Sequence, residues 1–370
     1  MKVSHAITLF GLAVGAFGAA ATQGCSSSSS SPAGDGGTGS SNTPPAKPSG
    51  PTTTSTTEHN YALAKLYLGD TDRSGVASQT AWKSYGYNID GKITTKDSTD
   101  VCTLAAGAAK STQTDGNGGT DNSFGENILP IILTTAGQDA AKKINDSIAS
   151  GSFTIMIDVT GLDGTPTQTA TGLKGFLNAG GTFDPVNKKA PTFTTADDWP
   201  VRPELLSDKM DAKSSTIRFP DAYVVNGEFV NGTPGNLTLN LAIGGVALDL
   251  TITQAVITCT AASGACNNGT IAGVINTEDL ISKLKKVAGR ISTSLCQGSA
   301  FDSIAQQIRQ ASDILSDGTN VAGKACDGIS IGLGFDSKEI GLPKTVGMLA
   351  TPTPDPCTTS DAGTGDAATD

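Results

Sequence analysis

Two acidic, glycine-rich stretches hold the residues with the clearest potential for chemistry. The first, DTDRSG, places Asp70, Asp72 and Ser74 at alternate positions, as the opening of a calcium-binding loop does. A bidentate acid normally completes the ligand set at the twelfth position of such a loop. Here that position is Ala81, so this stretch lacks its closing ligand.

The second stretch, DGNGGTD, runs from Asp115 to Asp121 and has Glu126 at its twelfth position. It departs from the calcium-loop pattern at Gly119, where an oxygen ligand belongs, and at Thr120, where the turn needs glycine. The alternative is a pair of Asx-turn loops without metal. The candidate ligands for calcium, the one cofactor considered, are Asp70, Asp72, Ser74, Asp115, Asn117, Asp121 and Glu126.

A third stretch, WKSYGYNIDG, gathers aromatic, amide and carboxylate side chains. Such groups stack on a sugar and hydrogen-bond to its hydroxyls, which makes this stretch a candidate ligand-binding site. The alternative is that its aromatic rings are large residues of the core. The candidate binding residues are Trp82, Tyr85, Tyr87, Asn88 and Asp90.

Charge and histidine content exclude several classes of function. The chain has 25 Lys and Arg against 35 Asp and Glu, so its surface repels phosphate backbones and nucleic acid is not expected as a partner. Of two histidines, only His59 lies beyond the N-terminal segment, which excludes Ser-His-Asp and Cys-His catalysis and multi-histidine metal sites. A hydrolase working through paired acids needs no histidine. Its candidate residues are Asp90, Asp115, Asp121 and Glu126.

The N-terminal segment has the layout of an export signal. Lys2 precedes an uncharged apolar run and the pair Gly24-Cys25, which resembles the signal of bacterial lipoproteins. We therefore expect residues 1–24 to be a signal peptide and Cys25 to carry fatty acid (palmitate), which anchors the chain to the outer membrane. Ordinary cleavage after Ala21, giving a secreted protein, is the alternative.

Low-complexity segments flank a folded region. Residues 25–58 contain hardly any large apolar residue and are predicted to be a disordered tether, and residues 348–370 a disordered acidic tail. Residues 59–347 are long enough for one folded region, with a candidate sub-boundary near residue 151.

Six cysteines remain once Cys25 is assigned to lipid, and in an exported chain they predict disulfides. Cys259 and Cys266 bracket a tight loop and are predicted to pair. We also expect Cys296 to pair with Cys326, because each follows a predicted helix, and Cys102 to pair with Cys357 by elimination.

The hydrophobic pattern predicts a β-rich α+β fold. Alternating apolar residues predict strands over residues 59–69, 151–161, 237–252 and 328–335, with hairpin turns at Asn226-Gly227 and Gly244-Gly245. Helical spacing predicts two amphipathic helices, capped by Thr277 and Ser299. The expected architecture is an antiparallel β-sandwich or open barrel with this C-terminal pair of helices packed on it.

Taken together, the signal, the Ser/Pro/Gly tether, GYNIDG, DGNGGTDNSFGENILPIIL and CDGISIGLGF resemble a group of uncharacterised exported lipoproteins of myxobacteria and related bacteria. The resemblance covers most of residues 60–340 and implies a single unit held at the cell envelope, without an established activity. The expected function is non-enzymatic binding of a glycan or envelope protein. The alternative is a carboxylate-dependent hydrolase acting on extracellular polysaccharide.

Overall fold

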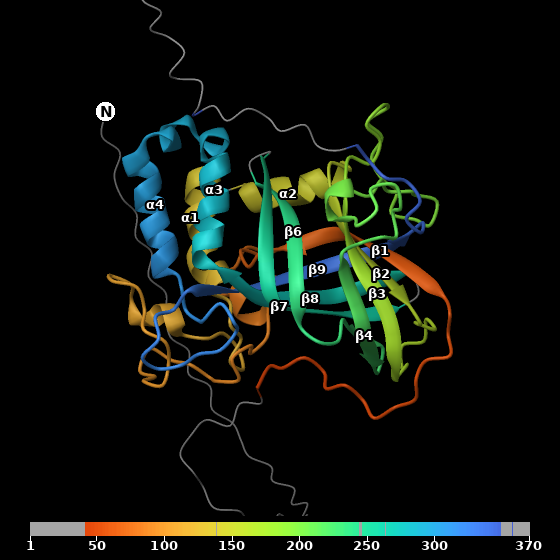
Figure 1. The fold of residues 1–370 in the computed structure, drawn as a ribbon, viewed down its shortest axis with the longest axis horizontal. Coiled ribbons are helices and arrows are strands. Elements are labelled where there is room, and N and C mark those ends of the chain that lie inside the picture. Colours follow the sequence, from red (N-terminus) through yellow and green to blue (C-terminus); the bar gives the residue numbers. More distant parts are fainter. Residues whose placement is uncertain (1–40, 138, 244–245, 263, 349–356, 358–370) are drawn as a thin grey trace, which may run out of the picture. The chain divides into compact units, whose positions relative to one another are not determined.

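A closed antiparallel β-barrel dominates the computed structural model, which describes residues 41–137, 139–243, 246–262, 264–348 and 357 (Figure 1). Within these residues the strands form one sheet in the order β5-β4-β3-β2-β1-β9-β8-β7-β6. They are β1 (Glu58–Tyr67), β2 (Thr154–Thr160), β3 (Ala170–Gly180), β4 (Ile217–Val225), β5 (Glu228–Val230), β6 (Gly235–Ile243), β7 (Val246–Ala262), β8 (Ala265–Asn276) and β9 (Gly328–Ile340).

Barrel closure depends on the long strand β7. One part of β7 pairs with β6, and the part around Thr258 pairs with β5, so eight strands form a ring and β6 extends the sheet beyond it. The Asn226-Gly227 turn, with both φ angles positive, sends the chain back from β4 into β5. The predicted β-rich antiparallel fold is confirmed. The sheet closes on itself, whereas the sequence predicted a sandwich or an open barrel.

Strand β2 is buried on both of its faces. Ile155 and Ile157 belong to the main hydrophobic cluster of the barrel, whereas Met156 packs with Trp199 in a second cluster. This second cluster lies under the long connection between β3 and β4, residues 181–216. Because that connection covers the outside of the sheet, polar residues on the outer face of β2, such as Asp158, are buried as well.

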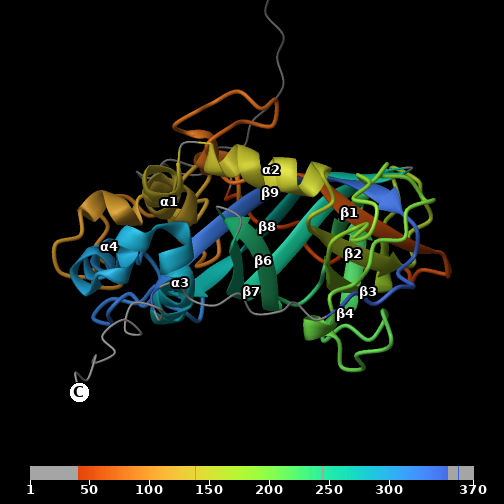
Figure 2. The same ribbon diagram turned by 90° about the horizontal axis from the view of Figure 1, so that it is seen from above.

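The helices gather mainly at one end of the barrel. Figures 1 and 2 show α1, α3 and α4 on the same side of the strands, whereas α2 runs along the sheet. Asn145 on α2 bonds to the backbone of Leu66 on β1. The helices are α1 (Leu129–Ala136), α2 (Ala140–Ala149), α3 (Thr277–Ile291) and α4 (Gly298–Gln310), with short helical turns η1 (Ala81–Ser84), η2 (Lys110–Gln113), η3 (Phe124–Ile128), η4 (Pro203–Leu205) and η5 (Thr293–Cys296).

The helix caps differ from those predicted. Asn276 caps α3, since its side chain accepts a hydrogen bond from the Asp279 backbone N–H, whereas the Thr277 hydroxyl is paired with Ser312. Helix α4 begins at Gly298, one residue before the predicted cap Ser299, and has no side-chain cap.

The segment before β1 is ordered against the barrel from residue 41, whereas the sequence predicted a tether up to residue 58. Thr53 donates its backbone N–H to Thr171, and the Tyr223 hydroxyl donates to the carbonyl of Pro45. Backbone hydrogen bonds hold this segment, so it needs no large apolar residues, which is why composition predicted disorder. Figure 1 shows it running along the barrel into β1.

Several other expectations concern residues that the structure does not describe. At the chain ends they are the signal, the lipidated Cys25, the tether up to residue 40 and most of the acidic tail, and within the chain the Gly244-Gly245 turn. The described residues belong to one compact unit. Strand β1 pairs with both β2 and β9, so elements on either side of residue 151 share one sheet.

Of the three disulfides, one joins two loops, one joins β7 to β8 and one joins η5 to Cys357. Cys259 and Cys266 pair as predicted, across the β7–β8 turn. The other two predicted pairs are wrong, because Cys102 pairs with Cys326 and Cys296 with Cys357. Thr103 exchanges backbone hydrogen bonds with the segment that leads to Cys326, and this pairing of distant loops brings Cys102 and Cys326 together.

Candidate functional site

An open cleft of about 770 Å³ lies beside the start of α1. Its wall combines two carboxylates, several hydroxyl and amide groups, one tryptophan and a short apolar stretch of α1. The lining residues are Gly69, Asp70, Ala77, Ser78, Gln79, Trp82, Gly125, Glu126, Leu129, Pro130, Leu133 and Thr134. A cavity with mostly apolar walls and a few polar groups is the usual form of a small-ligand site.

Two glycines bring the acidic residues of the cleft together. Gly69 ends the chain segment that leaves β1, and Gly125 lies in η3. A Cβ atom placed on Gly69 would lie 3.5 Å from the Cα of Gly125, and one placed on Gly125 would lie 2.7 Å from the Cβ of Trp82. Both added Cβ atoms would crowd Trp82, since the one on Gly69 would also lie 3.0 Å from the Cβ of Trp82, so glycine at both positions lets the two chain segments pack against this residue. Asp70 and Glu126, which follow the glycines, therefore project from neighbouring points of the chain.

The buried side chain of Asn122 fixes the loop that carries Glu126. Its Nδ2 donates to the carbonyl oxygens of Trp82, Tyr85 and Gly332, at 3.0 to 3.1 Å. Its Oδ1 accepts the N–H groups of Gly125 and Gly332, each at 2.9 Å. The wall of the cleft is thus tied to strand β9, which gives a loop site a rigid support.

Burial changes the acidity of both carboxyl groups. It raises the pKa of Glu126 to about 7, against the weaker opposing effects of Lys83 and Asn127. Burial also raises the pKa of Asp70, opposed by hydrogen bonds from the backbone. A carboxyl group with a pKa near neutrality both donates and accepts hydrogen bonds at physiological pH, which suits hydroxyl ligands and also general acid–base chemistry.

Most of the predicted aromatic binding residues are core side chains. Tyr85 and Tyr87 are 2% and 8% exposed, and their hydroxyls are engaged by Thr71 and Thr258. Trp82 alone lines the cleft, with Lys83 lying over its ring at 5.4 Å. The aromatic residues therefore do not form the exposed stacking surface that the sequence suggested.

The predicted calcium ligands lie in four separate places. Asp70 and Glu126, from different predicted loops, meet in the cleft. Asp72 forms an Asx turn, accepting the N–H groups of Ser74 and Val76. The exposed Asn117 bonds to Ser84.

The fourth place is a buried group of carboxylates on the other side of Asn122. Asp115 and Asp121 lie here with Asp90, which the sequence assigned to a sugar site. Asp313, from the loop after α4, adds a fourth carboxylate that sequence patterns did not reveal. Burial raises the pKa of Asp313 to about 7, and both its oxygens accept hydrogen bonds from Ser330.

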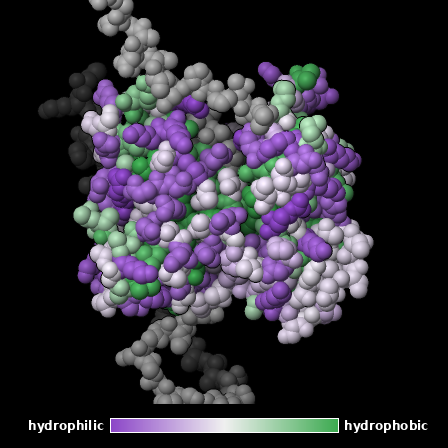
Figure 3. All heavy atoms as spheres, in the orientation of Figure 1, coloured by the Kyte–Doolittle hydropathy of each residue, from purple (hydrophilic) through white to green (hydrophobic). Residues whose placement is uncertain are grey.

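His59 takes no part in the cleft. Its Nδ1 lies 2.8 Å from a carboxylate oxygen of Glu339, and its ring stacks on Tyr61. The face of the molecule drawn in Figure 3 is mostly hydrophilic, with small apolar patches.

Comparison with protein-family models, curated proteins and solved structures finds no match to this chain. Among the residues that the structure describes, no helix is both long enough and apolar enough to span a bilayer.

Proposed function

We propose that this chain is an exported binding protein of the cell envelope whose cleft takes a neutral, hydroxyl-rich ligand, such as a segment of polysaccharide, without cleaving it. The observation that carries this proposal is the pairing of Asp70 and Glu126 with hydroxyl and amide groups in an open cleft of about 770 Å³. Carboxylates accept hydrogen bonds from sugar hydroxyls, while the exposed Pro130 and the half-buried Leu133 offer apolar contact to the ring faces.

The envelope location rests on the sequence and on the disulfides. Three disulfides fit an oxidising compartment outside the cytoplasm. In this proposal the lipid on Cys25 holds the protein at the outer membrane, as in the lipoproteins that its sequence resembles. The segment between Cys25 and residue 41 then separates the barrel from the anchor.

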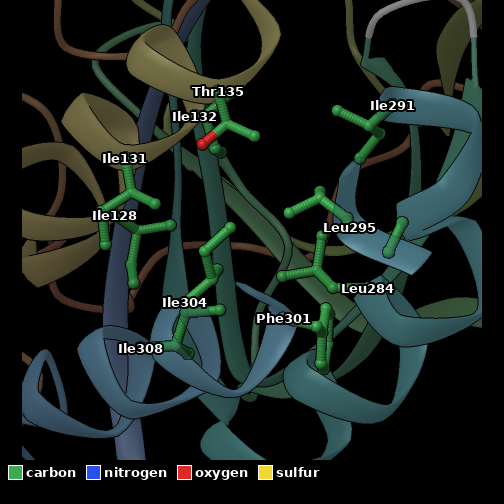
Figure 4. A pocket seen from close by; sticks show the side chains of 11 residues that line it. Ile128, Ile131, Ile132, Thr135, Leu284, Ile291, Leu295, Phe301, Ile304 and Ile308 are labelled. Atoms are coloured by element: carbon green, nitrogen blue, oxygen red, sulfur yellow. The ribbon is translucent and has the colours of Figure 1, made fainter. Parts of the chain in front are cut away.

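We also propose that α3 and α4 pack as a pair on the end of the barrel. Arg309 on α4 bonds to Glu278 on α3 at 2.6 Å. With α1, the two helices surround an apolar cavity of about 50 Å³, into which Leu284, Phe301 and Ile304 project (Figure 4). In this role the helices support α1, and hence one wall of the cleft.

The test is binding of the full-length mature protein, prepared with its disulfides intact, to an array of bacterial polysaccharides. We expect Glu126→Gln and Asp70→Asn to weaken binding at least about tenfold, because each removes a charged hydrogen-bond acceptor. The matched control is Asp163→Asn, since Asp163 is exposed in the turn between β2 and β3 and does not line the cleft. Unchanged affinity in both cleft variants would exclude this cleft as the binding site.

A carboxylate-dependent hydrolase is the second candidate. It is favoured by the pKa of Glu126, which burial raises to about 7, as a general acid requires. The two functions differ in their products. Incubation of a bound polysaccharide with the wild-type protein should release no new reducing ends if the protein only binds. Release that Glu126→Gln abolishes would establish hydrolysis in place of simple binding.

A further inference from the structure

Residues 88–94 wrap around two aspartates of the following loop. One oxygen of Asp121 accepts the backbone N–H groups of Ile89 at 2.6 Å and Asp90 at 3.3 Å. One oxygen of Asp115 accepts the N–H of Thr94 at 2.5 Å. The backbone thus fixes one oxygen of each carboxylate, and the two side chains are also hydrogen-bonded to each other.

These carboxylates repel one another in a site without a basic partner. Asp121 is 3% exposed, and burial followed by the charges of Asp90, Asp115 and Asp313 raises its pKa well above the usual value. Burial also raises the pKa of Asp115 to about 7. Within the described part of the chain, none of the ion pairs of lysine, arginine or histidine includes Asp90, Asp115 or Asp121. Burying several acids without a counter-charge is strongly unfavourable.

Three further oxygens of the same segment lack hydrogen-bond partners although they are buried. They are Oδ1 of Asn88, Oδ2 of Asp90 and Oγ1 of Thr94. Asn88 and Thr94 are 6% and 3% exposed. Such groups are almost always hydrogen-bonded in folded proteins, so three unpartnered oxygens in one segment are unusual. The backbone N–H of Thr94 bonds to Asp115, so the unpartnered hydroxyl belongs to a residue that already contacts that carboxylate.

Contacts with Ser41 and Asn42, in the segment before β1, determine which atom of Asn88 stays unpartnered. Asn88 Nδ2 donates to the hydroxyl of Ser41 at 3.0 Å and to the carbonyl of Lys92 at 2.6 Å. The backbone N–H of Asn88 donates to the carbonyl of Asn42. Because both donors are engaged in this way, only the amide oxygen is left to receive a donor or a cation.

We propose that this group of oxygens is a calcium-binding site, with Asp115 and Asp121 as carboxylate ligands and oxygens from Asn88, Asp90 and Thr94 completing the shell. The donor set favours calcium, because carboxylate, amide and hydroxyl oxygens suit a hard cation and the site offers no nitrogen or sulfur. Calcium also accepts irregular shells of six to eight oxygens, whereas magnesium demands a near-octahedral arrangement.

The site closes fully only when the ion binds. In the described residues no three Asp, Glu, His or Cys side chains already converge at metal-ligand distances. The Asp90 carboxylate therefore moves inward on binding, against the hydrogen bond that its other oxygen accepts from the Lys92 backbone at 2.7 Å. This site differs from both twelve-residue loops suggested by the sequence, since its ligands come from residues 88–94 and 115–121.

The experiment is calcium titration of the full-length, chelator-treated protein by calorimetry, together with thermal melting at pH 8 and pH 5. We expect one calcium per chain and a rise in melting temperature of several degrees at pH 8. The rise should be smaller at pH 5, because protons then compete for the same carboxylates. Magnesium at equal concentration should give a smaller rise.

Single substitutions test whether calcium binds at these oxygens. Asp115→Asn and Asp121→Asn should each weaken calcium binding at least tenfold, while Asp72→Asn, in the Asx turn of the first stretch, should leave it unchanged. If either aspartate variant fails to fold, Thr94→Val decides, since it removes an unpartnered hydroxyl without changing the shape of the side chain. It should raise the melting temperature without calcium and weaken calcium binding. Absence of calcium binding by the wild type, or undiminished binding by these variants, would overturn the proposal.

Discussion

Asp158 carries the most demanding prediction of the structure. It lies on the outer face of β2, only 1% exposed, and neither of its carboxylate oxygens has a hydrogen-bond donor. Burial, followed by the charge of Glu58, raises its pKa from 3.8 to about 8. Glu58 itself is bonded to Lys213 at 2.6 Å, so that cation is already engaged. We therefore expect Asp158 to be protonated in the folded protein at neutral pH.

The sign of the pH dependence follows from this raised pKa. The folded protein holds the proton of Asp158 more tightly than the unfolded chain, so the stabilisation is complete below pH 4 and is lost as the pH rises through 8. Each pH unit in this window changes the free energy of unfolding by about 1.4 kcal/mol. Between pH 5 and pH 7, Asp158 alone should lower the stability by about 3 kcal/mol.

The substitution Asp158→Asn removes this dependence, because an amide resembles the protonated carboxyl but does not ionise. Near pH 5 the variant should already be more stable than the wild type by about 1.5 kcal/mol. At pH 7 the difference should reach about 4 kcal/mol. Its new N–H groups also lie near the unpartnered amide oxygen of Asn60, which is paired opposite Asp158 in the sheet.

The assay is urea unfolding of both proteins at four pH values from 5 to 8, with chelator present to keep the buried carboxylates near Asp115 free of metal. Asp146→Asn is the matched control, because Asp146 is exposed on α2 and its loss should leave the slope with pH unchanged. Parallel stability curves for the wild type and Asp158→Asn would refute the reasoning, since they would mean that Asp158 is ionised throughout.

Three further predictions concern the supports of the barrel and of the cleft. Cys102→Ala opens a loop of 224 residues and should lower stability by about 5 kcal/mol, whereas Cys266→Ala opens one of 7 residues and should cost about 2 kcal/mol, as measured by urea unfolding. Asn122→Ala should lower the free energy of unfolding by at least about 3 kcal/mol, because buried hydrogen bonds are lost. The control Asn117→Ala, at an exposed residue, should lower it by less than about 0.5 kcal/mol. Equal effects of the two substitutions would contradict the proposed role of Asn122. Gly332→Ala should prevent native folding, seen as lost near-ultraviolet dichroism, because its Cβ would overlap the loop packed on β9.

Local sequence patterns predicted the strands but not the way in which the sheet closes. Alternating apolar residues identified β2, β7 and β9, and the Asn226-Gly227 pair identified the turn before β5. Closure requires β5 to pair with β7, with Val230 opposite Thr258. Local sequence patterns do not predict a pairing between residues so far apart in the chain. The disulfides show the same contrast, since Cys259 and Cys266 were paired correctly from their spacing, whereas the two long-range pairs were not.

Alternation gave no sign that the outer face of β2 is buried. A strand that alternates between apolar and polar residues normally exposes its polar side to water. Here the connection of residues 181–216 covers that side, with Trp199 packed on Met156 and Asp158 enclosed beneath it. The composition of this connection resembles that of a surface loop, so the burial of Asp158 could not be predicted from the sequence.

The candidate sites diverge because the chain changes direction at Asn122. Sequence spacing placed Asp121 and Glu126 in one calcium loop, with its ligands around a common centre. In the structure Asn122 is fixed to β9 between them, so Asp121 faces the buried carboxylates and Glu126 faces the cleft. Calcium bound at Asp121 would therefore restrain the same loop that carries Glu126. On this basis the two proposals are linked, and removing calcium should weaken polysaccharide binding by the wild type, although no calcium ligand lines the cleft.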